Sequence, residues 1–103
     1  RLAHLPLTLP HVPAGYTHAW HLYVIQTERR RELYDQLRAA NIFAQVHYIP
    51  VYRHPYYQDL GYPPGLCPLA EAYYARCLSL PMFPTLTDEQ QDYVIQVLEE
   101  FVN

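Results

Sequence analysis

The chain has 103 residues, a formal net charge of −3 and a pI near 6.0, and half of its residues are hydrophobic while 17% are charged. This length suits one folded domain with a modest core, and the hydrophobic content excludes an intrinsically disordered chain. All seven basic residues are arginines, which excludes a strongly basic nucleic-acid footprint and any chemistry that needs a lysine amine from this chain.

The first part of the chain is predicted to be a lead-in followed by a strand. Prolines at positions 6, 10 and 13 favour extended or turn conformations, and nothing there has helical spacing. We therefore expect residues 1–17 to form an entry arm or linker and residues 18–103 to form the domain proper. Within that domain, the β-branched and aromatic residues of 21–26 predict a first strand.

A helix and a second strand are expected next. Thr27 can cap a helix in which Leu33 and Leu37 share one face, and Asn41 is expected to end it. Residues 43–47 then have the composition of a second strand. Strand, helix and strand together form a recognisable unit at the start of the domain.

Two further helices and a short strand are predicted in the second half. Pro68 stands where the first residue of a helix would, and 77–80 is a brief apolar run that predicts a short third strand. Thr87 and Gln90 form a capping box before an amphipathic C-terminal helix. This order of elements predicts an α/β domain with two layers (α+β), in which helices cover one face of a small sheet.

The segment 45–57 concentrates tyrosine, histidine, arginine and proline. Pro50 and Pro55 disfavour one regular helix, so a stiff loop after the second strand is expected. Tyrosine faces stack on sugars or bases, tyrosine and histidine tips bond hydroxyls and phosphates, and Arg53 can pair with a phosphate. A packed core can explain single tyrosines, but it explains the combination poorly. We expect this segment to border a ligand.

Other kinds of site have weaker support. The six histidines lack the ligand spacing of a zinc site, so no metal is expected, and no GxSxG elbow is present for nucleophilic catalysis. Cys67 and Cys77 match buried free thiols in a reducing compartment better than a disulfide framework. No apolar run approaches the ~20 residues that span a bilayer, and no signal-peptide pattern is present, so a cytoplasmic location is expected.

Four motifs in order suggest a family. Residues 47–57, 67–71, 78–81 and 86–90 closely resemble the C-terminal end of the sugar aminotransferases of the DegT/DnrJ/EryC1/StrS family, and the resemblance extends from about His18 onward. It implies the small C-terminal domain of a fold-type I aminotransferase that depends on pyridoxal phosphate. Within the family, residues 47–57 together with residues 70–76 most resemble the transaminases of pseudaminic acid biosynthesis. Those enzymes transfer an amino group from glutamate to C4 of a UDP-linked 4-keto-6-deoxy-N-acetylhexosamine.

The resemblance also implies which residues face the substrate. The substrate-side loop of the family falls here on His47, Tyr48, Pro50, Arg53, His54 and Tyr57. His47 and Tyr48 are expected nearest the sugar, and Arg53 or His54 toward the nucleotide diphosphate. Tyr52 departs from the family pattern, because many relatives have histidine there.

The resemblance further assigns the catalytic lysine and its cofactor outside this chain. A large domain that binds pyridoxal phosphate is expected before Arg1, so the 103 residues alone would bind no cofactor covalently and would be inactive. The expected assembly is a homodimer in which the small domain helps to wall the active site. Two alternatives remain: a non-catalytic module that binds sugar nucleotides or another partner, and the same family acting on a different keto sugar.

Overall fold

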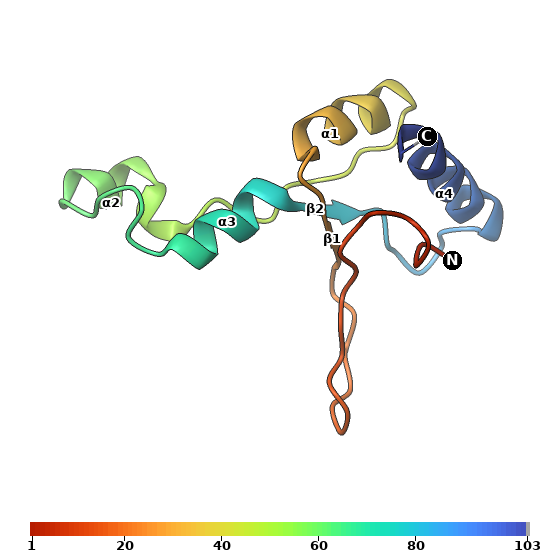
Figure 1. The fold of residues 1–103 in the computed structure, drawn as a ribbon, viewed down its shortest axis with the longest axis horizontal. Helices are drawn as coiled ribbons and strands as arrows, with labels where there is room; N and C mark the ends of the chain where they lie inside the picture. Colours follow the sequence, from red (N-terminus) through yellow and green to blue (C-terminus); the bar gives the residue numbers. More distant parts are fainter. Residues whose placement is uncertain (103) are drawn as a thin grey trace.

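Residues 1–102 are described by the computed structural model, and they form a two-stranded sheet with four α-helices. The elements in chain order are β1 (Tyr23–Gln26), α1 (Arg30–Ala39), the 3-10 turn η1 (Val51–Arg53), α2 (Pro55–Asp59), α3 (Pro68–Arg76), β2 (Cys77–Leu80) and α4 (Asp88–Val102). Figure 1 shows α1 and α4 side by side at one end, with α2 and α3 extended away from them. The small α/β fold expected from the sequence is confirmed.

The sheet pairs β1 with β2 in antiparallel register, with Val24 opposite Ser79 and Ile25 opposite Leu78. Both strands were predicted. The predicted second strand over 43–47 is wrong, because only Gln45 pairs there, exchanging two backbone hydrogen bonds of 3.1 and 2.8 Å with Ser79. In this register Phe43, the preceding residue on the same face as Gln45, lies opposite Pro81. Pro81 has no N–H to donate to Phe43. On the other side of the bridge, the N–H of Cys77 is already donated to the Tyr73 carbonyl, so the ladder ends after one bridge.

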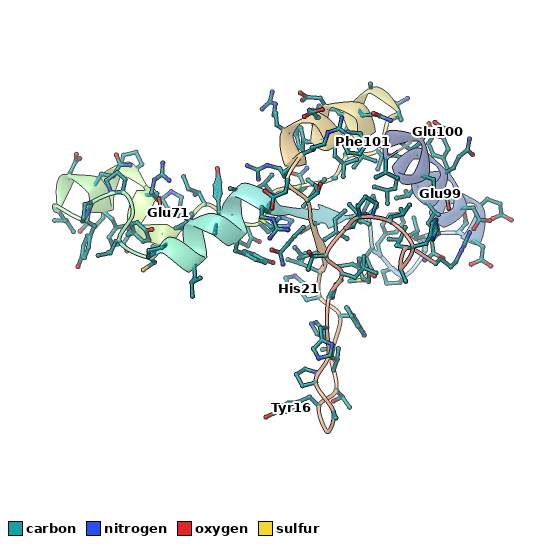
Figure 2. All side chains as sticks on the ribbon, viewed as in Figure 1. Tyr16, His21, Glu71, Glu99, Glu100 and Phe101 are labelled. Atoms are coloured by element: carbon teal, nitrogen blue, oxygen red, sulfur yellow. The ribbon has the colours of Figure 1, made fainter. Side chains whose placement is uncertain are left out.

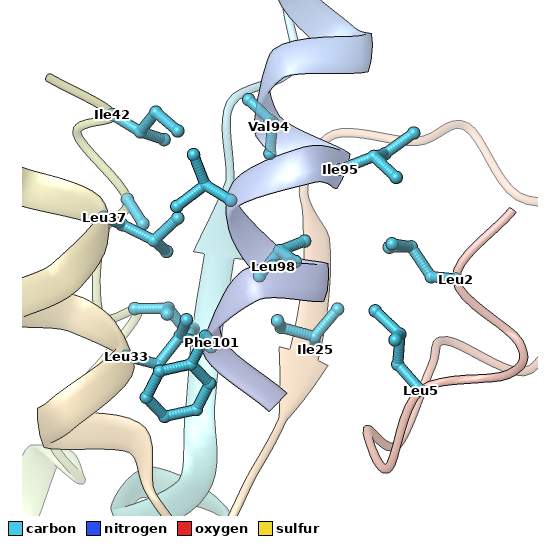
Figure 3. Close-up of a cluster of buried hydrophobic side chains, with 13 residues drawn as sticks. Leu2, Leu5, Ile25, Leu33, Leu37, Ile42, Val94, Ile95, Leu98 and Phe101 are labelled. Atoms are coloured by element: carbon cyan, nitrogen blue, oxygen red, sulfur yellow. The ribbon is translucent and has the colours of Figure 1, made fainter. Parts of the chain in front are cut away.

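The core lies between the sheet, α1 and α4 (Figure 3). Helical spacing places Leu33 and Leu37 of α1 on its buried face, and both side chains have no exposed surface. β1 and β2 contribute Ile25 and Leu78, which are equally buried. The buried face of α4 consists of Val94, Ile95, Val97, Leu98 and Phe101.

The helix boundaries follow local capping chemistry. Asn41 adopts a left-handed conformation with φ of 62° just after the C-cap residue Ala40, which ends α1 as expected. The Thr87 hydroxyl accepts the Gln90 N–H at 3.1 Å, and the Gln90 side chain accepts the Thr87 N–H at 3.0 Å. This reciprocal pair is the predicted capping box, and it fixes the start of α4.

The N-terminal residues contribute to the same core. Leu2 and Leu5 are buried against it, and Thr8 exchanges two backbone hydrogen bonds of 2.9 Å with Gln26 of β1. After Leu9, which still packs against the core, the chain leaves as an excursion over residues 10–22, which includes the exposed Tyr16 and His21 (Figure 2). The division of the chain at residue 17 stays a prediction.

Residues 48–76 form a second projection, here called the side arm, which includes η1, α2 and α3 (Figure 1). The helix after Pro68 is confirmed, but none of its residues is buried, and Leu69 is 88% exposed. The helix touches β1, and the Arg30 guanidinium lies 5.2 Å from the ring centroid of Tyr74, but outer apolar residues of the helix such as Leu69 face solvent. No helix among residues 1–102 is both long and apolar enough to cross a membrane.

Candidate functional site

His47 lies at the base of the side arm, next to the most buried strand. Its Nδ1 is 2.9 Å from the hydroxyl oxygen of Ser79, a residue of β2 that is only 5% exposed. Tyr48 follows with its ring centroid 4.6 Å from the imidazole, and the peptide bond between the two residues is cis. Because Tyr48 is 67% exposed, this pair presents one fixed ring and one accessible ring to the surface.

The thiol of Cys77 lies close to the backbone of His47. Its sulfur is 3.8 Å from the His47 carbonyl oxygen, and the residue is completely buried. Burial raises the pKa of the Cys77 thiol, although nearby Arg30 opposes the shift. The thiol therefore stays protonated near neutral pH and acts as a packed side chain. The expectation of buried free thiols is confirmed at Cys77 and wrong at Cys67, which is exposed.

Arg53 is held by an acidic residue of α3. Its guanidinium donates to the Glu71 carboxylate at 2.8 Å, and Figure 2 shows Glu71 on the side of the arm where η1 and α2 lie. Beside this ion pair, the Tyr52 hydroxyl accepts the N–H of Cys67 at 3.1 Å. The Tyr52 hydroxyl, together with the Gly65 backbone and Arg53, holds the pKa of the Glu71 carboxyl below its ordinary value.

The remaining predicted site residues lie along η1 and α2. The Pro50 carbonyl accepts the Arg53 N–H at 2.9 Å, and the His54 carbonyl accepts the Tyr57 N–H at 3.0 Å. Tyr57 packs edge-on against Tyr62 with ring centroids 6.2 Å apart. The six residues therefore form two groups. One lies beside β2 at the base of the side arm, namely His47 and Tyr48; the other lies further out along it, namely Pro50, Arg53, His54 and Tyr57.

Acid is expected to weaken the contacts of Glu71. Because the folded pKa of Glu71 lies below its ordinary value of 4.5, these contacts add stability that is fully present above pH 4.5 and is lost as the pH falls through the folded pKa. A 13C NMR titration of the Glu71 carboxyl should give a midpoint below 4.5, and Tyr52→Phe should move it upward. Arg38→Gln, in α1, should leave it unchanged. A midpoint at or above 4.5 in the unmodified chain would contradict this assignment.

Two residues that hold the predicted site were not identified from the sequence. Ser79 is the one polar residue in an apolar strand, Cys77–Leu80, and Glu71 stands in the first turn of α3, where acidic residues are common. A buried serine in a strand was a signal that a polar partner must lie nearby. The partner, residue 47, is 32 positions away and could not be found by spacing.

Two surface hollows within residues 1–102 include none of the predicted site residues. One, of about 330 Å³, lies between the N-terminal residues, β2 and α4 and has an apolar lining that includes Leu80, Met82 and Ile95. The other, of about 460 Å³, borders Phe43 and Tyr93. Within residues 1–102, no group of three His, Cys, Asp or Glu residues is arranged to hold a metal ion.

The fold matches part of several solved aminotransferases. It superposes on DesV of Streptomyces venezuelae, solved in complex with a ketimine intermediate, with a TM-score of 0.92 and 38% identity, over 99% of this chain and 28% of that chain. Helicobacter pylori PseC, an aminotransferase involved in the biosynthesis of pseudoaminic acid, matches with a TM-score of 0.65 and 32% identity, over 79% of this chain and 23% of PseC. The fold is that of a small domain within an aminotransferase.

Sequence comparison gives the family. The pattern of the DegT/DnrJ/EryC1/StrS aminotransferase family matches residues 1–99, so the chain belongs to that family, as its motifs indicated. The spore coat polysaccharide biosynthesis protein SpsC of Bacillus subtilis is 40% identical over 93% of this chain and 27% of its own length. The UDP-N-acetyl-3-dehydro-alpha-D-glucosamine 3-aminotransferase of Acidithiobacillus ferrooxidans is 39% identical over 86% of this chain and 24% of its own length. The chain thus spans about a quarter of the length of the relatives it matches.

Members of this family depend on pyridoxal phosphate. In such enzymes a lysine amine binds the cofactor covalently. None of the 103 residues is a lysine, so the residues of this chain do not fit the covalent attachment of the cofactor. What the chain offers instead is the polar and aromatic surface of residues 47–57.

Proposed function

We propose that this chain is the C-terminal small domain of a nucleotide-sugar aminotransferase that uses pyridoxal phosphate, and that residues 47–57 line the sugar-nucleotide side of its active site. The observation that supports this most strongly is the pair formed by His47 and Tyr48. Ser79 holds the first ring, while the second is 67% exposed. Such a pair combines a fixed polar group with an aromatic face, which is the combination that sugar recognition uses.

Each residue of the pair has a distinct task in this proposal. The imidazole of His47 bonds a hydroxyl of the sugar, and the face of Tyr48 packs against the sugar ring. Both contacts orient the keto carbon, because a ligand held at two points cannot rotate freely. The cofactor, bound by the rest of the protein, supplies the amino-transfer chemistry.

The part of the active-site lining proposed to contact the nucleotide consists of Arg53, His54 and Tyr57. The Arg53 guanidinium is paired with Glu71, and its side chain stays 38% exposed. A diphosphate oxygen would accept a charge-assisted hydrogen bond from its accessible N–H groups. His54, exposed at the start of α2, and Tyr57 would border the nucleotide.

The finer proposal concerns the substrate and the assembly. We infer amination at C4 of a UDP-4-keto-6-deoxy-N-acetylhexosamine with glutamate as donor, by a cytoplasmic homodimer in which a large domain of the same protein binds the cofactor. The motifs over 47–57 and 70–76 and the likeness to PseC support this substrate. Amination at C3 is the second candidate, supported by the relative from Acidithiobacillus ferrooxidans.

The test is amino transfer by the full-length protein that contains this domain. Incubation with pyridoxal phosphate, glutamate and either a UDP-4-keto or a UDP-3-keto hexosamine should yield 2-oxoglutarate and one amino sugar. We expect turnover of the 4-keto substrate. Turnover of the 3-keto sugar alone would replace the C4 assignment by the C3 one. Binding of the sugar nucleotide without any 2-oxoglutarate would indicate a non-catalytic binding module.

A further inference from the structure

Ser79 is the residue best placed to control the proposed sugar contact without making one itself. Its side chain is buried; its backbone lies opposite Val24 of β1 on one edge and makes two hydrogen bonds to Gln45 on the other. His47 follows Gln45 by two residues, so the two side chains share a face of the extended segment. The serine hydroxyl consequently meets the imidazole at a fixed point, Nδ1, at 2.9 Å.

The geometry of this contact also bears on the position of the imidazole proton. Within residues 1–102, Nδ1 of His47 is the hydrogen-bond partner of the Ser79 side chain. A hydroxyl that is removed from water needs an acceptor for its proton. When the imidazole is neutral, Nδ1 can accept that proton only if the ring hydrogen is on Nε2.

Resting on the proposed function, we propose that Ser79 is a positioning residue for the sugar site. Its hydroxyl donates to Nδ1 of His47, which fixes the plane of the ring and keeps Nε2 as an N–H donor toward a hydroxyl of the sugar nucleotide. A ring held in this way is set before the substrate arrives, so no binding free energy is lost in orienting it. Ser79 touches neither the substrate nor the cofactor in this arrangement.

The hydrogen bond itself can be measured on the 103-residue chain without any activity. In 15N NMR spectra at a pH where imidazoles are neutral, Nε2 of His47 should bear the proton and Nδ1 should show the shift of a hydrogen-bonded acceptor. Ser79→Ala should move the Nδ1 resonance toward its value in free imidazole, and Ser79→Thr, which keeps a hydroxyl, should restore it. A ring proton found on Nδ1, or an Nδ1 resonance that is unchanged in Ser79→Ala, would overturn the proposal.

A matched control is available at Thr27. This residue is also buried, at 7% exposed, and its hydroxyl accepts the Arg29 N–H at 3.2 Å, a contact that does not involve His47. Thr27→Val removes a buried hydroxyl at a similar structural cost and should leave the Nδ1 resonance in place. Loss of the His47 signal pattern in Thr27→Val as well would assign the effect to general destabilisation and overturn the specific role of Ser79.

Kinetics of the full-length protein separate this inference from the proposed function. Ser79→Ala should raise KM for the sugar nucleotide about tenfold, the effect of losing one well-placed hydrogen bond, while kcat and KM for glutamate stay within about twofold. Ser79→Thr should recover most of the loss. If His47→Ala raises this KM and Ser79→Ala does not, the positioning role of Ser79 is wrong, while the proposed sugar contact of His47 is supported. If neither variant changes it, the proposed sugar contact of His47 is wrong.

Discussion

Replacing Leu78 with alanine is expected to lower the free energy of unfolding by about 2–5 kcal/mol, the range for truncating a fully buried leucine. Leu78 has no exposed surface and sits at the middle of β2, in the cluster that joins the sheet to α1 and α4. Truncation leaves a cavity that the surrounding strands cannot close, because β2 is paired on both edges. Urea unfolding followed by circular dichroism on the 103-residue chain measures the change.

Leu69→Ala is the matched control for this experiment. Leu69 is 88% exposed on α3, so the same truncation there should change the free energy of unfolding by no more than about 0.5 kcal/mol. Leu78→Val gives a smaller cavity and a measurable intermediate value if the alanine variant is unfolded without urea. Equal losses at positions 69 and 78 would mean that the side arm is packed as tightly as the core, contrary to the structure.

Removal of the His47 imidazole is expected to lower kcat/KM for the sugar nucleotide about 10- to 100-fold in the full-length protein, which corresponds to ~1.4–2.7 kcal/mol of lost transition-state stabilisation. The ring is anchored by Ser79 and stands beside the exposed Tyr48, so its loss removes the fixed half of the proposed sugar contact. Tyr48→Phe keeps the ring face and should have a smaller effect.

The control for this prediction is another histidine. His4 lies 3.3 Å from Glu99 of α4 in an exposed contact remote from the side arm, so His4→Ala should leave the kinetics unchanged. Single-turnover measurements with glutamate alone should be normal in His47→Ala, because the loss concerns the sugar. Unchanged kinetics for the keto sugar in both His47→Ala and Tyr48→Phe would remove these residues from the substrate wall.

Elements with strong local signals were predicted from the sequence. The capping box of Thr87 and Gln90 defines α4 because each partner satisfies a backbone group of the other, and that requires nothing from the rest of the chain. The strand over 43–47 failed for the opposite reason. Its composition suits a strand, but a strand also needs a partner with free backbone groups. On one side of the Gln45 bridge, that partner would be Pro81, which has no N–H to donate. Pairing of this kind depends on residues far away in the sequence.

For the candidate site, the sequence predicted the segment and its chemistry, but not the residues that hold it in place. The residue types of 47–57 indicated ligand chemistry, and the family motifs indicated which ligand. The residues that fix this segment, Ser79 and Glu71, lie 32 and 18 positions from their partners. Likewise the apolar residues of α3 gave a helix but could not reveal that Leu69 has no partner among residues 1–102.

The position of α4 in the chain has a consequence for protein synthesis. Leu2 and Leu98 belong to one core, yet they are made at opposite ends of the chain, and at ~5–20 residues per second the ribosome needs about 5–20 s to get from one to the other. Until α4 has been made, Ile25, Leu33 and Leu78 lack the apolar helix face that completes their core. Nascent chains are therefore expected to need protection by chaperones until α4 emerges, and a transcript cut before Asp88 should yield a polypeptide that is quickly degraded.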